Sequence, residues 1–190
     1  KEIIRRYFKS ACEFRKGSGS EEIVYKNELL MKQLNLSFDD MPVIGAAMKK
    51  AEQTQAPAAA IELRDGRIAT GKTSSLLGAS SAMLLNALKL LAGIPDQKEL
   101  ISREVIEPVQ RLKINSFGNR NPRLHTDEML IALSICGISD PTAQQALDQL
   151  KNLKGCDVHS SVILSPVDEN IFRKLGVNLT CEPIYQDKTL

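Results

Sequence analysis

The residues best suited to chemistry lie in one polar segment, 66–75, which reads GRIATGKTSS. It matches the phosphate-loop pattern GxxxxGK[ST], in which backbone N–H groups surround a phosphate, the lysine adds charge and the hydroxyl binds magnesium. Such a loop joins a strand to a helix. Here the β-branched residues of segment 67–70 follow Asp65-Gly66, a dipeptide suited to a tight turn, which favours a β-hairpin.

A nucleotide triphosphatase also uses an acidic residue near its metal. The strand predicted at 161–164 is followed by Ser165-Pro166, and Asp168 falls inside the next predicted helix. No acidic residue is therefore well placed to hold magnesium. The sequence favours a hairpin followed by a helix, with the phosphate loop as the alternative.

The start of that helix is a natural site for an anion in either case. We expect the helix to cover residues 76–92, which are apolar on almost every side and therefore typical of a buried core helix. Each preceding hydroxyl can cap it, and free N–H groups at a helix start favour negative charge. We therefore predict that an anionic ligand binds four consecutive residues: Lys72, Thr73, Ser74 and Ser75.

A second polar segment, 116–125, reads SFGNRNPRLH. Arg120 and Arg123 carry planar guanidinium groups that suit phosphate or carboxylate, although loop arginines are often simply solvated or ion-paired. His125 is the candidate acid–base group; alternatively, its ring donates to a backbone carbonyl. Thr126 is predicted to cap the next helix.

The cysteine and histidine pattern does not predict a zinc site. Cysteines stand at 12, 136, 156 and 181, without a CxxC pair. Cys156 and His159 would supply only two of the four ligands that zinc needs, so a structural role is the simpler hypothesis for His159. The cysteine spacing is typical of reduced thiols, which indicates a cytoplasmic protein. No cofactor is identified.

Composition narrows the classes of partner. The 190 residues are 43% hydrophobic, which suffices for one good core, and the net charge is +2. With 4% aromatic residues and no tryptophan, the chain offers little for bases to stack on, so we expect no nucleic-acid partner. Neither a signal peptide nor a membrane span is evident, so we expect no membrane partner.

The predicted elements divide the chain in two. Helices at 1–16, 21–35 and 37–53 form a small helical unit, residues 1–55. Residues 56–190 form an α/β domain with a hairpin at 58–70 and a strand–helix–strand unit at 158–181, whose two strands should be parallel neighbours. The fold class is therefore α/β: a mixed sheet of four or five strands in a three-layer α-β-α domain. Because the first residues already read as helix without a methionine, we expect a piece of a longer protein.

Several runs together resemble a known bacterial family. They are EIIRRYF at 2–8, GKTS at 71–74, GNRNPRLH at 118–125, LKG at 153–155, HSS at 159–161 and RKLGVN at 173–178. On these residues the chain is identified as the C-terminal region of the domain of unknown function 1846 family, also called uncharacterised protein family 0371. The family's biochemistry is unassigned.

The resemblance implies an architecture. A longer N-terminal α/β domain would precede the chain, 1–55 would be a helical linker domain, and 56–190 would have a topology similar to cytidine deaminases. Deaminase chemistry does not carry over, because zinc deaminases need a His-x-Glu and a Pro-Cys-x-x-Cys. This chain contains no CxxC, and its corresponding helix start reads Thr73-Ser74-Ser75.

Two functions follow as hypotheses. In the first, the lysine and hydroxyl group at 72–75 joins Arg120, Arg123 and His125 in a half-site for a phosphate-bearing small molecule, completed by the N-terminal domain. In the second, the chain is a non-catalytic assembly module that packs against its own N-terminal domain or forms a homo-oligomer, because the apolar side of helix 1–16 needs a partner. We expect no catalysis from the isolated chain.

Overall fold

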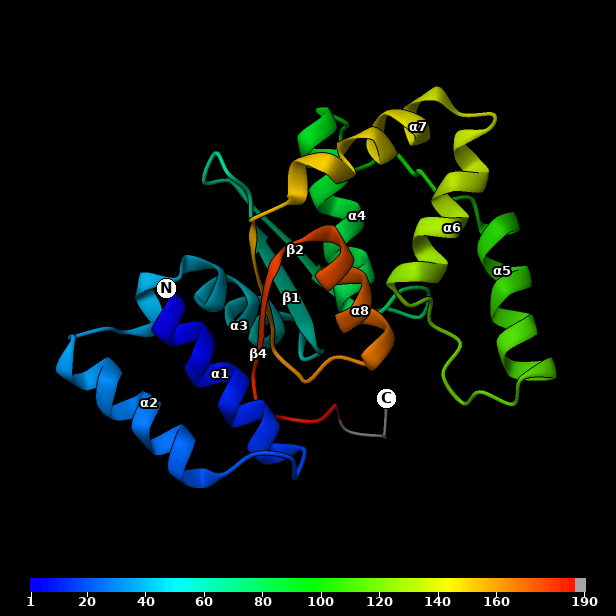
Figure 1. The fold of residues 1–190 in the computed structure, drawn as a ribbon. Helices are drawn as coiled ribbons and strands as arrows, with labels where there is room; N and C mark the ends of the chain where they lie inside the picture. The colour runs from blue at the N-terminus through cyan, green and yellow to red at the C-terminus, as the bar shows by residue number, and fades with distance from the viewer. Residues whose placement is uncertain (187–190) are drawn as a thin grey trace.

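A four-stranded mixed sheet forms the centre of the molecule, for which a computed structural model describes residues 1–186 (Figure 1). The strand order is β2-β1-β3-β4. Strand β1 pairs antiparallel with both β2 and β3, and β3 pairs parallel with β4. The strands are β1 (Ala58–Glu62), β2 (Ile68–Lys72), β3 (Asp157–Ser160) and β4 (Asn178–Cys181).

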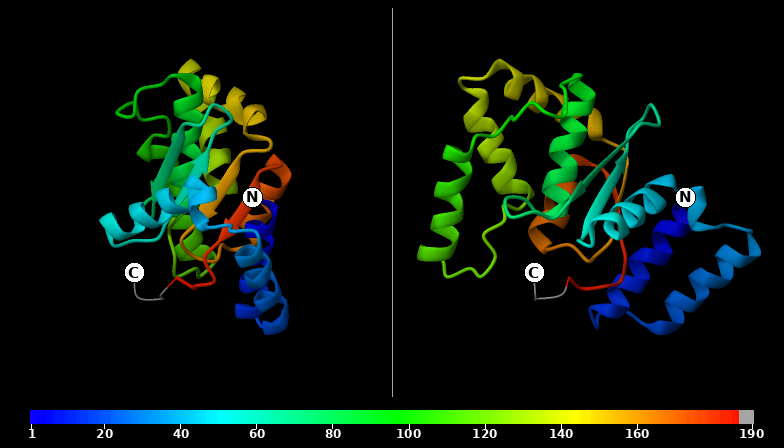
Figure 2. Two further views of the ribbon diagram at one scale, coloured as in Figure 1. Left: turned by 90° about the vertical axis from the view of Figure 1, so that its left-hand side faces the viewer. Right: turned by 180° about the vertical axis from the view of Figure 1, so that it is seen from behind.

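Helices cover both faces of this sheet, giving three layers (Figures 1 and 2). One face carries α3 (Pro42–Thr54) and α1 (Glu2–Arg15), with α2 (Glu21–Gln33) packed outside α1. The other carries α4 (Ala79–Ala92) and α8 (Pro166–Leu175). Beyond these lie α5 (Arg103–Arg111), α6 (Thr126–Gly137) and α7 (Pro141–Leu147). Two short 3-10 segments, η1 (Phe38–Asp40) and η3 (Asp148–Leu153), and a π-helical turn, η2 (Leu112–Ser116), complete the elements.

Alternation along the strands fills both interlayer spaces. In β1, Ala59 and Ile61 belong to the core under α4, whereas Ala60 belongs to the core under α1 and α3. Strand β3 follows the same rule: Val158 lies in the α4 core, and His159 contacts Phe8 of α1 with ring centroids 4.9 Å apart. Period-two alternation thus produces a sheet buried on both faces.

Several local predictions are confirmed. Gly66 has φ +81°, and Leu63 N–H donates to Arg67 O at 2.8 Å, so the hairpin turn forms where the Asp65-Gly66 dipeptide predicts it. The two strands around α8 are parallel neighbours. Ser165-Pro166 predicts the start of a helix, and Ser165 does cap α8 by accepting from Asp168 N–H. The mixed sheet with helices on both faces is also as expected.

The predicted start of the core helix is wrong. Gly71 does not end a strand but lies within β2, opposite Ala59, and α4 begins only at Ala79 with Gly78 as its N-cap. Thr73 N–H still extends the hairpin by donating to Pro57 O at 2.8 Å. The GxxxxGKT match therefore forms a hairpin strand and not a loop around a phosphate.

The region after α4 also differs from expectation. The sequence predicts a helix over 96–115 with a break at Pro108, but α5 begins only at Arg103 and continues through Pro108 into η2. Proline costs the helix one hydrogen bond to the preceding turn. Here the backbone widens into a π-helical turn immediately afterwards instead of ending.

Candidate functional site

A pocket of about 370 Å³ lies where three helices begin. The starts of α4, α6 and α8 all contribute to its walls. Within the described chain it is lined by Pro57, Thr73, Gly78, Ala79, Ser80, Asn121, Arg123, His125, Val162, Ile163, Leu164, Ser165, Pro166, Asp168, Tyr185 and Gln186. Because each helix start carries partial positive charge, three of them meeting at one cavity favour an anion there.

Of the three helix starts, that of α4 has the fewest hydrogen-bond partners for its first backbone amides. Its N-cap is Gly78, so no side chain caps the helix, and the first amides of a helix have no intrahelical acceptor. Ser80 lines the pocket with only 3% of its surface exposed, and its hydroxyl makes no hydrogen bond within residues 1–186. The Ser80 oxygen is not completely shielded, because over residues 1–186 only Arg5 Nε is a fully buried side-chain atom without a partner. The hydroxyl can therefore donate to a ligand in the pocket.

The polar loop that ends at His125 is held against this helix start. Leu77 and Leu124 form an isolated parallel bridge, in which Leu124 N–H donates to Leu76 O at 2.9 Å and Gly78 N–H to Leu124 O at 3.2 Å. Arg123 adds a third link, from its Nε to Ser74 O at 2.8 Å. The loop and the start of the core helix therefore lie side by side, although 43 residues separate Ser81 from the Leu124 oxygen to which it donates.

His125 is the N-cap of α6, so the prediction that Thr126 caps this helix is wrong. The His125 N–H donates to Glu128 at 2.8 Å, whereas Thr126 directs both its N–H and its hydroxyl to Asp168 Oδ1, at 2.9 and 2.8 Å. The other Asp168 oxygen lies 3.0 Å from His125 Nδ1 and accepts from Ser165 at 2.8 Å. The Nε2 atom of His125 makes no hydrogen bond to another described residue.

Asp168 and His125 stabilise each other's charged forms. Burial opposes ionisation of Asp168, but hydrogen bonds from His125, the Thr126 N–H and Ser165 outweigh it and lower the pKa of Asp168 to about 2. The hydrogen bond to Asp168 raises the pKa of His125, against the opposing effect of burial. The ring is thereby oriented by one nitrogen and leaves the other available, as an acid–base histidine requires.

The structure gathers some of the predicted site residues and separates others. Thr73, Arg123 and His125 line the pocket. Lys72 is exposed at the end of β2 and does not line it, and the same is true of Arg120 in the preceding loop. Ser74 and Ser75 are exposed in the turn before α4, where Ser74 Oγ accepts from Leu77 N–H at 3.1 Å.

Two residues that line the pocket, Ser80 and Asp168, are not predicted as site residues from the sequence. Ser80 is missed because the predicted helix begins three residues too early. Asp168 reads only as an interior helix residue, although the spacing Ser165-x-x-Asp168 is the signature of a helix start. That signature could have placed the carboxylate at a helix N-terminus, but not beside His125.

Lys113 holds the polar loop 116–125 against the start of α6. Its side chain is only 3% exposed and donates to Arg123 O and to Glu128 Oε2, both at 2.6 Å. We expect Lys113→Met to lower the free energy of unfolding by about 2 kcal/mol, because two acceptors lose a charged donor. Urea denaturation measures this, with Lys49→Met on the exposed side of α3 as a control expected to change little. Equal effects of the two substitutions would contradict the bracing role.

The remaining histidine and the cysteines lie elsewhere. His159 is fully buried, with its ring nitrogens 2.9 Å from Thr180 Oγ1 and 3.3 Å from Glu182 Oε1. All four cysteines are free thiols. Among residues 1–186, no three side chains of His, Cys, Asp or Glu cluster as metal ligands would. Over the same range, none of the helices combines the length and apolar character needed to cross a membrane.

Taken as a class, this is an α/β protein with a mixed sheet and a polar pocket at converging helix starts. The sequence pattern described as "Domain of unknown function DUF1846, C-terminal" matches residues 39–190. The chain belongs to this family, which is also called UPF0371.

The relatives are bacterial and longer than this chain. A UPF0371 protein of Corynebacterium glutamicum (strain R) is 53% identical over 189 residues, and one of Streptococcus pyogenes serotype M5 is 47% identical over 189 residues. Each alignment covers the whole of this chain and only 38% of the relative. The chain therefore spans well under half the length of the curated relatives that it matches.

Proposed function

We propose that the pocket at the starts of α4, α6 and α8 binds the anionic group of a small molecule, a phosphate or a carboxylate. The observation that carries this proposal is the uncapped start of α4, where Ser80 lines the cavity and its hydroxyl makes no hydrogen bond within the described chain. Free first-turn amides and a hydroxyl are the donors that such a group needs.

The charges around the cavity support the same ligand class. Of the described side chains that line it, Arg123 and protonated His125 carry positive charge, and Asp168 carries negative charge. The positive charge of protonated His125 neutralises the negative charge of Asp168. The guanidinium of Arg123 therefore leaves the pocket with a net positive charge. Arg123 uses only Nε, to Ser74 O, so its terminal nitrogens can form the paired hydrogen bonds that suit oxyanions.

In this proposal His125 transfers a proton to or from the bound molecule through Nε2, and Asp168 is the positioning residue behind it. The rest of the full-length protein would complete the site, because ligand sites often lie between domains. The hairpin β1–β2, the buried helix α4 and the later unit β3–α8–β4, in the strand order β2-β1-β3-β4, support the expected likeness to cytidine deaminases. Zinc chemistry is not part of the proposal.

Ser80→Ala tests the binding step. We expect sulfate and phosphate to raise the melting temperature of the wild type, and Ser80→Ala to weaken their binding several-fold, as the loss of one hydrogen bond predicts. The same variant should be no less stable without ligand, because it removes only an unpartnered hydroxyl. Calorimetric titration with sulfate, whose charge is constant across neutral pH, measures the affinity.

Lys72→Ala is the matched control, because Lys72 is exposed outside the pocket, and it should bind sulfate within about twofold of wild type. If neither the chain nor the full-length protein binds sulfate, phosphate or phosphate-bearing nucleotides and sugars, the proposed function is wrong. Equal weakening by the alanine variants at 72 and 80 would place the anion elsewhere.

The alternative function, an assembly module, is favoured by a different surface than expected. The apolar side of α1 needs no partner outside the chain, because Ile4, Phe8 and Ala11 are buried within it. Exposed apolar side chains lie instead on α2 and its C-cap Leu34, where Ile23, Tyr25, Leu30 and Leu34 are 43–56% exposed. Light scattering tests the homo-oligomer hypothesis. If both the chain and the full-length protein are monomers at all concentrations, that hypothesis is excluded.

A further inference from the structure

The outer edge of β4 is an unpaired sheet edge. Asn178 N–H donates to Cys156 O at 2.8 Å and Glu182 N–H to Ser160 O at 2.9 Å, both on the side of β3. In a parallel pair, alternate residues direct their backbone groups to the neighbouring strand. Leu179 and Cys181 therefore direct their N–H and C=O groups away from β3, toward the open side.

The two edges of the sheet differ in their protection. At the opposite edge, Asn86 of α4 donates to Thr70 O of β2 at 2.8 Å. At the β4 edge, Cys12 Sγ donates to Cys181 O at 3.2 Å, but the backbone groups of Leu179 meet no partner within residues 1–186. An open edge is a ready template for another strand, and proteins usually block it.

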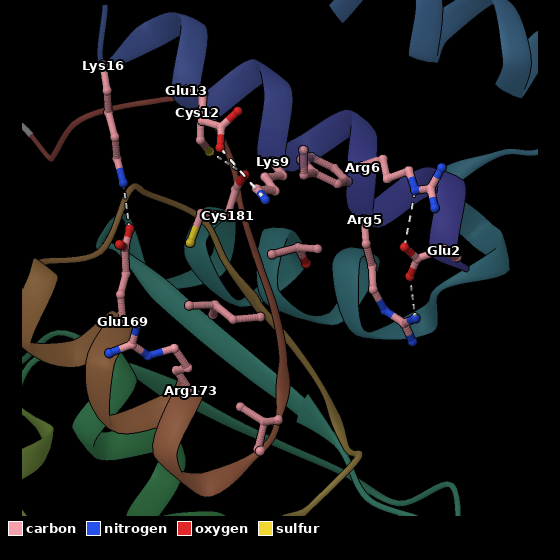
Figure 3. A pocket seen from close by; sticks show the side chains of 15 residues that line it. Glu2, Arg5, Arg6, Lys9, Cys12, Glu13, Lys16, Glu169, Arg173 and Cys181 are labelled. Atoms are coloured by element: carbon pink, nitrogen blue, oxygen red, sulfur yellow. Dashed lines mark hydrogen bonds and ion pairs between the residues drawn. The ribbon is translucent and has the colours of Figure 1, made fainter. Parts of the chain in front are cut away.

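This edge forms the floor of a groove of about 580 Å³ between α1 and α8 (Figure 3). Phe8, Val177 and Leu179 supply apolar surface within it. The charged side chains around it are largely paired with one another: Lys16 with Glu169 at 2.6 Å, and Glu2 with Arg5 and Arg6 at 3.4 and 3.2 Å. A volume of nearly twenty waters, at about 30 Å³ each, leaves room for a stretch of extended chain.

We propose that an extended segment from the N-terminal part of the full-length protein lies in this groove and adds a fifth strand beside β4. Strand addition is a common recognition mode, in which main-chain hydrogen bonds give affinity and side-chain pockets give specificity. The relatives indicate where such a segment would come from. This chain matches only 38% of their length, and the matching family pattern is that of a C-terminal domain. The first turns of α1, with Glu2 and Arg5, line the groove, so a preceding chain enters beside it.

A second copy of this chain fits the edge less well. Pairing β4 with its own copy would bring two α1 helices together. The residues that α1 and its C-cap contribute to the groove carry a net positive charge, so like charges would face each other across the contact. They are the four cations Arg5, Arg6, Lys9 and Lys16 and the two carboxylates Glu2 and Glu13. A segment from the N-terminal part of the full-length protein does not bring a second α1 helix into the contact.

Hydrogen exchange of individual amides tests the proposal. In the full-length protein we expect the Leu179 and Cys181 amides to exchange at least about tenfold more slowly than in the 190-residue chain. The Thr180 amide, which faces β3, is the internal control and should be protected in both. Equal exchange of Leu179 in the two proteins overturns the proposal. Protection that appears in the 190-residue chain as its concentration rises also overturns it, in favour of a second copy.

A substitution isolates the backbone contribution. Leu179→Pro removes an N–H that faces away from β3, a position where an edge strand tolerates proline. In the full-length protein it should return the Cys181 amide to the fast exchange of the 190-residue chain, whereas Leu179→Val should leave it slow. Continued protection of Thr180 shows that the sheet has not unfolded. Slow Cys181 exchange in the proline variant would contradict strand addition.

Discussion

Gly71→Ala is expected to lower the free energy of unfolding by more than about 3 kcal/mol, enough to leave little folded protein if the wild type is marginally stable. A Cβ at Gly71 would overlap the backbone nitrogen of Met83 and lie 2.6 Å from the carbonyl carbon of Ala82. Both atoms belong to the main chain of α4, so no side-chain rotation relieves the clash. The helix and β2 would have to separate, and the core beneath them would lose contacts.

Gly45→Ala is the matched control for this experiment. Gly45 lies in α3, and a Cβ at this position would have no other atom within 4 Å, so alanine should stabilise the helix by about 0.5–1 kcal/mol. Urea denaturation of both variants gives the two free energies. A Gly71→Ala protein as stable as wild type would mean that β2 and α4 do not approach each other as closely as described.

The second large effect is expected for Asp168→Asn. The carboxylate is 7% exposed in its side chain and accepts from His125, from Ser165, and from both the N–H and the hydroxyl of Thr126. An amide replaces one acceptor oxygen with a donor, which then faces a donor. We expect a loss of about 3 kcal/mol in the free energy of unfolding, in the range for a broken buried charge pair.

The pH dependence of stability identifies the charge pair. The pKa of Asp168 is lowered to about 2 from an ordinary 3.8, so its contribution of about 2 kcal/mol is complete above pH 4 and is lost as the pH falls toward 2. The pKa of His125 is raised, so its contribution is complete below its ordinary value of 6.5 and is lost as the pH rises through the raised value. The pair is therefore most stabilising between about pH 4 and 6.5.

Urea denaturation from pH 3 to 9 measures both the acid-side and the alkaline-side loss of stability. In Asp168→Asn the acid-side contribution should disappear and the alkaline-side decline should shrink, because His125 loses its carboxylate partner. Asp39→Asn, at an exposed position in η1, should keep the wild-type pH profile. If the wild type and Asp168→Asn differ by the same amount at every pH, the pair is not charged in the folded protein.

Sequence and structure contribute differently to the candidate site. The density of donors in the segment 116–125 points to Arg123 and His125 from residue type alone, and the structure brings both to one pocket with Thr73. Residue type could not separate them from Lys72 or Arg120, which also carry cationic donors but lie outside the pocket. Which of several similar donors face one cavity depends on contacts between segments far apart in the chain.

The amino-acid sequence by itself determined features that depend on neighbours along the chain. These include the turn at Gly66, the Ser165 cap and the left-handed glycine at Gly176 that ends α8. Tertiary structure alone decided that β2 continues through Gly71 and that α4 starts at Ala79, because the strand and helix backbones touch there. It also decided that Asp168 orients His125, since a buried carboxylate takes whichever donors the packing of α6 and α8 brings to it.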